Sequence, residues 1–245
     1  KAHYKFFFHS VIQSRESYVL LDILFEENLY SHLQKIGIQS SILSVGGDCT
    51  NVHCPTPECL LGDKLTAFAP HTTGVLFGRD RQLEIVKQLF DIASLFDVSE
   101  NVRHIYTTHE AVAKKELHYR GLNKLTPQNV LSDTFNMACL IGQRGYSGNA
   151  SEYTELLDGI SRLRGFIYSG NFTLDTAILC AAKAALLTAL LLNGEKTIRR
   201  FEKGNDLSHW NIQRPEYVKL NRLKKTNPEA FYYFYCALEI NNFLA

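Results

Sequence analysis

The amino-acid sequence predicts an α+β fold, in which a small β-rich part precedes a helical bundle. Three short β-prone runs lie near the start of the chain, at Tyr4–Phe8, Tyr18–Phe25 and Ile38–Val45. Proline is absent from residues 128–214, so that stretch permits long helices. Strands and helices that separate along one chain are typical of the α+β class. We expect the strands to form a small mixed β-sheet.

The composition is that of an ordinary globular protein. Of the 245 residues, 45% are hydrophobic and 21% are charged, which excludes the disordered and low-complexity classes. The length suits one large domain or two modest ones, and the change of pattern predicts two, residues 1–99 and 100–245. The formal net charge of +1 argues against nucleic-acid binding over the whole surface, although such a balance still allows a local basic groove.

Neither a membrane span nor a disulfide framework is expected. The longest apolar run, Ala177–Leu192, is interrupted by Lys183 and is shorter than the roughly 20 apolar residues that a span needs, so it predicts a buried helix. The six cysteines are too dilute for a disulfide scaffold, and two of them lie in apolar helical patterns. We therefore expect reduced thiols and a cytoplasmic protein.

Two helices are expected at the end of the first part. The helix predicted over Pro57–Ala69 carries Leu61, Leu65 and Phe68 in one apolar stripe, as a helix that packs on a core should. A loop rich in Thr and Gly follows, and a second amphipathic helix is predicted over Arg81–Phe96.

The second part is expected to be a helical bundle. Thr126 and Pro127 are a helix-start signal, with Thr as the N-cap and Pro in the first helical position. Asn193 and Gly194 form a helix-stop signal. The predicted helices are Asn101–Tyr119, Pro127–Ile141, Ser151–Tyr168, Leu174–Leu192 and Phe231–Leu244.

Lys64 is the most informative polar residue, because it lies within the apolar stripe of the first predicted helix. Lysine is rarely buried without a partner. The structural interpretation is that its aliphatic stem covers apolar surface while the ammonium group reaches water. The functional interpretation is that the ammonium group meets an anion, such as a carboxylate or a phosphate.

Two further charged features have both a structural and a functional interpretation. Lys87 and Asp91 are four residues apart on the second predicted helix, a spacing typical of a solvated surface pair; function would require Asp91 to face the same cavity as Lys64. Asp22 interrupts a strand that is apolar on both faces, where a carboxylate is costly unless it is hydrogen-bonded, protonated or bound to a metal. An edge strand facing water is the alternative for Asp22.

These residues stand in segments that resemble motifs of a known family. The run Leu61–Pro70, which contains Lys64, and the run Lys87–Ile92, which contains Asp91, are similar to the lysine and later aspartate motifs of the abortive-infection nucleotidyltransferase toxins, the AbiEii/AbiGii family. Leu20–Phe25 stands where that family has its third core strand and an acidic residue. The resemblance covers roughly residues 1–100 by motif order.

The resemblance implies a polymerase-β-like nucleotidyltransferase with a helical second domain. It implies that Lys64, with Thr66 and Lys87, contacts the phosphates of an NTP, and that Asp91 positions Lys64 or assists the acceptor hydroxyl group. Asp22 would be a carboxylate near Mg²⁺, which in such enzymes binds the triphosphate during the displacement of pyrophosphate. The implied partners are an NTP, an RNA acceptor and an antitoxin protein.

The sequence departs from the family pattern in its metal-binding motif. The family has a Gly-Gly or Gly-Ser turn followed by an Asp-x-Asp pair, and Asp-x-Asp occurs nowhere in this chain. Gln88 stands where the family has an acid just before the final aspartate motif. Because the chain begins at Lys1 and its only methionine is Met137, we expect that an N-terminal portion carrying the missing motifs is absent.

Three hypotheses therefore stay open. The chain is a nucleotidyltransferase whose metal-binding segment lies outside this sequence, or a truncated, catalytically inactive relative that acts as a protein-interaction module. The third hypothesis is an unrelated α+β domain whose lysine motif matches by chance.

Overall fold

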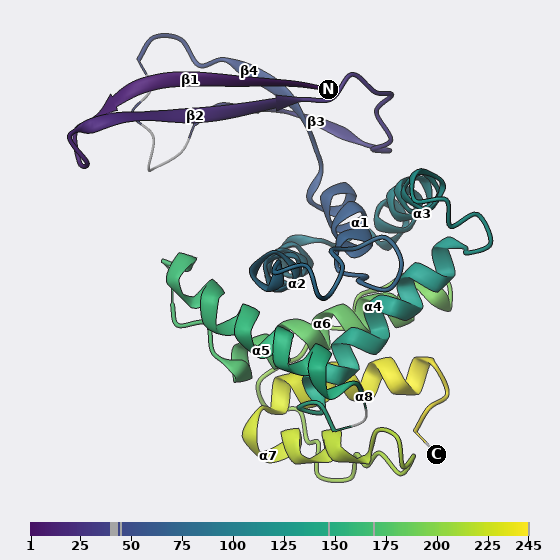
Figure 1. Cartoon of the computed structure of the whole chain (residues 1–245). Coiled ribbons are helices and arrows are strands. Elements are labelled where there is room, and N and C mark those ends of the chain that lie inside the picture. Colours follow the sequence, from purple (N-terminus) through teal and green to yellow (C-terminus); the bar gives the residue numbers. More distant parts are fainter. Residues whose placement is uncertain (40–43, 45, 147, 169, 245) are drawn as a thin grey trace.

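The computed structural model describes residues 1–39, 44, 46–146, 148–168 and 170–244 (Figure 1). Its strands are β1 (Ala2–Ser10), β2 (Arg15–Ile23), β3 (Leu33–Gly37) and β4 (Asn51–Pro55). Its α-helices are α1 (Pro57–Ala67), α2 (Gln82–Val98), α3 (Val102–Tyr119), α4 (Pro127–Gly142), α5 (Ala150–Leu163), α6 (Leu174–Leu192), α7 (Leu223–Thr226) and α8 (Pro228–Ile240). Two short 3₁₀ helices, η1 (Arg164–Phe166) and η2 (Val218–Arg222), complete the described elements. The fold is α+β, as predicted.

The strands form two separate antiparallel pairs, β1 with β2 and β3 with β4. The expectation of a mixed sheet is therefore wrong for the described residues, because a mixed sheet needs a parallel pair and a crossover connection between its strands. Most of the predicted strand Ile38–Val45 lies outside the described residues, and β3 ends just before it. The β3–β4 pair was not predicted.

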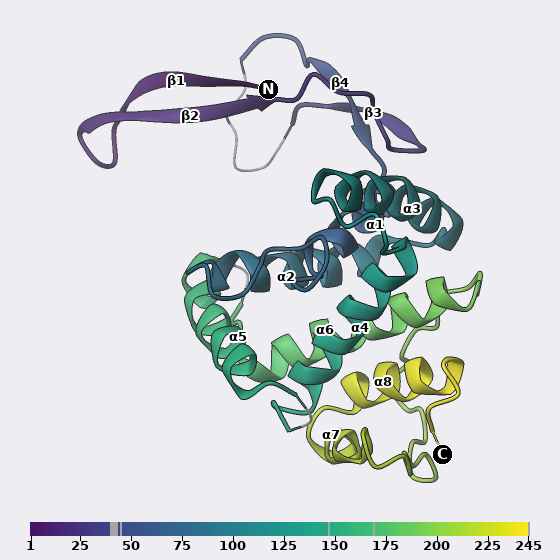
Figure 2. The same cartoon turned by 45° about the vertical axis from the view of Figure 1, so that its right-hand side comes forward.

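The β1–β2 hairpin presents two different faces to solvent. One face carries a run of exposed apolar side chains, Tyr4, Phe6, Phe8, Val19 and Leu21, which ends at Ser17 opposite Phe8. On the other face, His3 contacts Asp22, and the ammonium group of Lys5 lies 4.4 Å from the centre of the Tyr18 ring. In Figures 1 and 2 the hairpin lies apart from the helices. The hairpin therefore leaves a continuous apolar surface exposed.

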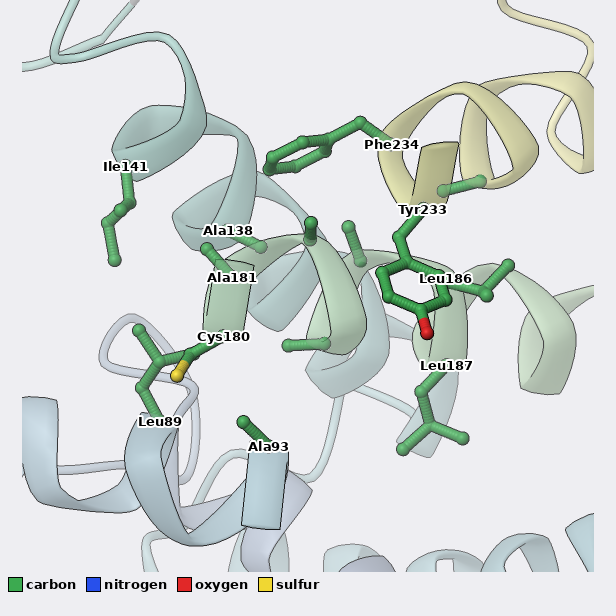
Figure 3. Close-up of a cluster of buried hydrophobic side chains, with 14 of the residues drawn as sticks. Leu89, Ala93, Ala138, Ile141, Cys180, Ala181, Leu186, Leu187, Tyr233 and Phe234 are labelled. Atoms are coloured by element: carbon green, nitrogen blue, oxygen red, sulfur yellow. The ribbon is translucent and has the colours of Figure 1, made fainter. Parts of the chain in front are cut away.

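Helix α6 is the centre of the helical part and packs against α2, α4 and α8. It is apolar around its whole circumference, which is typical of a helix surrounded by protein. By length and composition α6 could cross a membrane, but 78% of its most apolar window is buried inside the protein. Figure 3 shows the side chains that meet around α6, among them Leu89, Ala93, Ala138, Ile141, Cys180, Ala181, Leu186, Leu187, Tyr233 and Phe234.

One hydrophobic core crosses the domain boundary that we predicted near residue 100. Leu61, Leu65 and Leu89, which precede the boundary, belong to the same buried cluster as Ile105 and Leu187, which follow it. Helix α1 packs against both α2 and α3. The division into residues 1–99 and 100–245 stays a prediction, and the described core does not divide there.

Helices α1 and α3 approach each other so closely that only glycine fits between them. A Cβ atom on Gly62 would lie 2.4 Å from the backbone oxygen of Ile105 and 2.9 Å from the backbone nitrogen of His109. The ring of His109, which is buried, lies within hydrogen-bond distance of the Gly62 carbonyl oxygen, at 3.3 Å. Gly62 therefore sets the distance between the two helices.

Lys183, the charge within the apolar run of α6, is paired with Asp97 at the end of α2. Its ammonium nitrogen lies 2.7 and 2.8 Å from the two carboxylate oxygens. The two side chains differ in exposure, at 9% for Lys183 and 53% for Asp97. Loss of the ion pair therefore costs more free energy at Lys183, which water barely reaches, than at Asp97, which water solvates.

We expect Asp97→Asn to destabilise the protein more than Lys183→Met does. The first change leaves a buried ammonium group without its counter-charge, at a cost of about 2 kcal/mol, which is below the cost for a fully buried pair. The second leaves a carboxylate that water solvates, so its cost should stay within about 1 kcal/mol. Urea unfolding followed by circular dichroism measures both, with the surface change Lys114→Met as control. An equal or larger loss for Lys183→Met would contradict this account.

Candidate functional site

Lys64 lies on α1, in the position between buried apolar side chains that its spacing predicts. The helix begins at Pro57, and the N-cap Thr56 side chain accepts a hydrogen bond from the Cys59 backbone N–H. Leu61 and Leu65 are buried in the core, whereas Lys64 turns its ammonium group toward α2. The aliphatic stem thus covers core while the charge reaches a neighbouring helix.

The ammonium group of Lys64 meets two side chains of α2. Its Nζ atom lies 2.9 Å from Asp91 Oδ2 and donates a hydrogen bond to Gln88 Oε1 at 3.1 Å. Asp91 Oδ2 also accepts a hydrogen bond from Lys87 Nζ at 3.2 Å. The predicted proximity of Lys64 and Asp91 is therefore observed, although their catalytic roles stay predictions. We call Lys64, Lys87, Gln88 and Asp91 the α1–α2 site.

The α1–α2 site has an unbalanced positive charge. Two lysines share one carboxylate oxygen, so the three charged groups carry a formal charge of +1. Lys64 and Asp91 are partly buried, where charge interactions are screened less than on the open surface. Both ammonium groups would attract an anion that approached this site. The Asp91 carboxylate would keep the Lys64 ammonium group oriented toward that anion.

Thr66 does not face the α1–α2 site. It is buried, and its hydroxyl group donates a hydrogen bond to the Asp63 carbonyl oxygen at 2.7 Å. Its own carbonyl oxygen accepts a hydrogen bond from the Thr73 hydroxyl group at 2.7 Å. The Thr66 hydroxyl group is thus already hydrogen-bonded within the protein, which argues against the predicted contact with a nucleotide.

Asp22 also lies apart from the α1–α2 site. It stands on β2, where its carboxylate contacts His3 of β1 and its side chain is 56% exposed. The strand is apolar on both faces, but nothing described covers either face of the hairpin, so water solvates the carboxylate. The water-facing alternative is the one that the structure supports.

Comparison with known protein families identifies the family to which this chain belongs. The family model described as "Nucleotidyl transferase AbiEii toxin, Type IV TA system" matches residues 1–159, well over half of the chain. The chain belongs to this family. The match extends beyond the motifs, through α4 and into α5. No curated protein and no solved structure matches the chain.

Gln88 stands where the resemblance implies an acidic residue just before the final aspartate motif. The structure gives this departure a physical role, because Gln88 accepts a hydrogen bond from Lys64 without adding a negative charge. The spacing of Gln88 and Asp91 could predict this contact, since residues three positions apart share one face of a helix.

The described residues include no ready-made cluster of ligands for the Mg²⁺ ion that the AbiEii resemblance implies. Mg²⁺ requires octahedral oxygen coordination, with carboxylates among its usual ligands. Within the described ranges, no group of three or more His, Cys, Asp and Glu side chains is arranged to hold a metal ion. Asp91 accepts from two lysines, and Asp22 contacts His3. Asp22 as a metal ligand therefore stays a prediction without a supporting neighbour.

The loop that joins α1 to α2 is held by His71. Its Nδ1 atom lies 2.8 Å from Asp133 of α4, and its Nε2 atom lies 3.0 Å from Glu152 of α5. Asp133, which is buried, also accepts hydrogen bonds from the His71 backbone N–H and the Thr72 hydroxyl group, at 2.8 and 2.9 Å. Since both ring nitrogens face carboxylates, the charged imidazolium form satisfies both. This contact fixes how the two helices of the site are connected.

We expect the His71 contact to make stability depend on pH. Burial lowers the pKa of His71, but the hydrogen bonds to Glu152 and Asp133 outweigh it and raise the pKa above its ordinary value of 6.5. The stabilisation should therefore be full below pH 6.5 and be lost as pH rises through the raised pKa. The urea midpoint of wild type should exceed that of His71→Gln at pH 6, by a margin that shrinks at pH 9. His9→Gln, on the exposed hairpin, serves as control, and a margin that grows with pH would contradict the assignment.

Proposed function

We propose that this AbiEii-family chain is a nucleotidyltransferase that binds an NTP at the α1–α2 site and transfers a nucleotide to RNA. The observation that carries the proposal is the Lys64–Asp91 pair, at 2.9 Å, with Lys87 on the same carboxylate oxygen. Two ammonium groups at one place, held by a single carboxylate, suit a polyanionic ligand such as a triphosphate. Family membership implies a nucleotide substrate and an antitoxin partner.

In the proposed reaction, Lys64 binds a phosphate oxygen and Asp91 orients Lys64. Lys87 adds a second contact to the phosphates, and Gln88 keeps the Lys64 ammonium group directed away from the core. The acceptor hydroxyl oxygen forms a bond to the α-phosphorus and gives its proton to solvent water, while the bond from the α-phosphorus to the bridging oxygen breaks and pyrophosphate leaves. Mg²⁺ carried in with the nucleotide would neutralise phosphate charge that two lysines leave unbalanced.

The alternative proposal is an inactive relative that acts as a protein-interaction module. The exposed apolar face of the β1–β2 hairpin favours it, because large exposed apolar patches often mark interaction sites. Under either proposal we place the protein in the cytoplasm, where NTP and RNA are present. The six cysteines are all free thiols, as a reducing compartment requires.

We expect Lys64→Ala to abolish most nucleotide transfer. Labelled NTP is incubated with total RNA, Mg²⁺ and the protein, and incorporation into RNA is counted. Loss of one positioned cationic contact should reduce transfer by about a hundredfold, and Asp91→Asn by about tenfold, because the lysine remains but is less well oriented.

Lys114→Ala is the matched control, since Lys114 is also a helical lysine paired with an acid, at 2.8 Å from Glu110. Its transfer should equal that of wild type. Equal transfer by wild type, Lys64→Ala and Asp91→Asn would remove the assignment of the α1–α2 site. If none of the four proteins transfers a nucleotide, the interaction module is the better proposal.

A further inference from the structure

A second positively charged pocket lies at the other end of the helical part, between the end of α4 and the η2–α7 segment. It has a volume of about 410 Å³, which is in the range of small-ligand sites. Arg144, Lys219 and Arg222 line it, and no acidic residue does. In Figure 1, α7 lies on the opposite side of α4 and α6 from α1 and α2. We call this the α4–α7 pocket.

The cations of the α4–α7 pocket are largely available to a ligand. One guanidinium nitrogen of Arg144 lies 2.9 Å from Asp175, which leaves its other N–H groups free to donate elsewhere. In the part of the chain that the structure describes, neither Lys219 nor Arg222 has a carboxylate within ion-pair distance. An anionic ligand would therefore meet three positive side chains and one nearby carboxylate.

An exposed aromatic ring adjoins these cations. Tyr146 is 67% exposed and lines the pocket, and the ammonium nitrogen of Lys219 lies 4.0 Å from the centre of its ring. A ring with one face open to solvent is a surface on which a nucleobase stacks, and positive side chains beside such a ring track a phosphate backbone. The pocket thus combines the two elements of single-stranded nucleic-acid binding.

A buried amide shows what else the ligand must carry. Gln143 also lines the pocket and is 5% exposed, and its Oε1 atom is buried with no hydrogen-bond partner in the described structure. Buried polar atoms without partners are rare in proteins, because each one loses its hydrogen bond to water. In the structure the protein covers this oxygen, so a ligand reaches it only when the Gln143 side chain turns toward the pocket. The oxygen accepts hydrogen bonds, and a phosphodiester has no hydrogen to donate. The ligand should therefore combine negative charge with a donor, such as a 2′-hydroxyl group.

We propose that the α4–α7 pocket binds a single-stranded segment of RNA. Lys219, Arg222 and Arg144 contact phosphates, and Tyr146 stacks on a base. The Gln143 side chain turns toward the ligand and accepts a hydrogen bond from a 2′-hydroxyl group or a base N–H. The inference deepens the proposed function, on which it rests, by giving the RNA acceptor a docking site separate from the α1–α2 site.

The test is fluorescence anisotropy of the full chain with a labelled oligouridylate of about twelve nucleotides, long enough to exceed one subsite. The double variant Lys219→Ala/Arg222→Ala should bind at least tenfold more weakly than wild type, and the salt dependence should become shallower as phosphate contacts are lost. Lys114→Ala/Arg164→Ala removes the same charge elsewhere on the surface and should bind like wild type. Tyr146→Ala should weaken binding about fivefold and leave the salt dependence unchanged.

The variant Gln143→Met distinguishes a role of Gln143 in RNA recognition from a role in protein stability. It should reduce the preference for RNA over DNA of the same sequence, while the melting temperature stays at the wild-type value or rises, because no hydrogen bond within the protein is lost. A lower melting temperature with an unchanged RNA preference would overturn the role of Gln143 in binding.

The remaining outcomes distinguish this inference from the proposed function. Equal RNA binding by the two double variants, or no RNA binding by wild type, would overturn the RNA site. Displacement of the oligonucleotide by UMP at an equal concentration would also overturn it, because the pocket would then bind a mononucleotide. RNA binding that depends on Lys219 and Arg222, in a wild-type protein that transfers no nucleotide, supports the site and refutes the transferase.

Discussion

The close packing of α1 between α2 and α3 is the constraint on which the rest of the described structure depends. On one side, Gly62 lets the backbone of α1 approach α3 to a distance that excludes any side chain. On the other side, Lys64 spans to Gln88 and Asp91 of α2. A helix fixed on two sides has little freedom to rotate, so the direction of its lysine is set by backbone packing. The geometry of the α1–α2 site is therefore set more by the spacing of the helices than by the Lys64–Asp91 ion pair.

The helices could be predicted from sequence because their signals are local. The apolar stripe, the Thr-Pro start and the Asn-Gly stop place α1, α4 and α6 to within a few residues, and the predicted Leu174–Leu192 coincides with α6. The proximity of Lys64 and Asp91 was predicted from the family resemblance together with the position of Lys64 in the stripe. The helix positions rest on patterns within a few helical turns, whereas the proximity of residues on two different helices rests on the resemblance.

The features that the sequence does not predict depend on tertiary packing, that is, on which other part of the chain contacts a given residue. For Asp22 the sequence leaves a buried and a water-facing position open, because strand pattern alone does not say whether a second layer is present. Thr66 shares the lysine motif, yet its hydroxyl group bonds back to the helix. The α4–α7 pocket brings Gln143 together with Lys219, which are 76 positions apart, and no local signal predicts such a meeting.

The aromatic face of the β1–β2 hairpin has a consequence for the behaviour of the chain in solution. Phenylalanine rings that face water, on strands whose outer edges pair with no other described strand, favour association between molecules through both the rings and the backbone. A net charge near zero supplies little electrostatic repulsion to oppose this. The side chains that favour association are thus confined to a few residues near the N-terminus, whereas the apolar side chains of the helical part are mostly buried in one core.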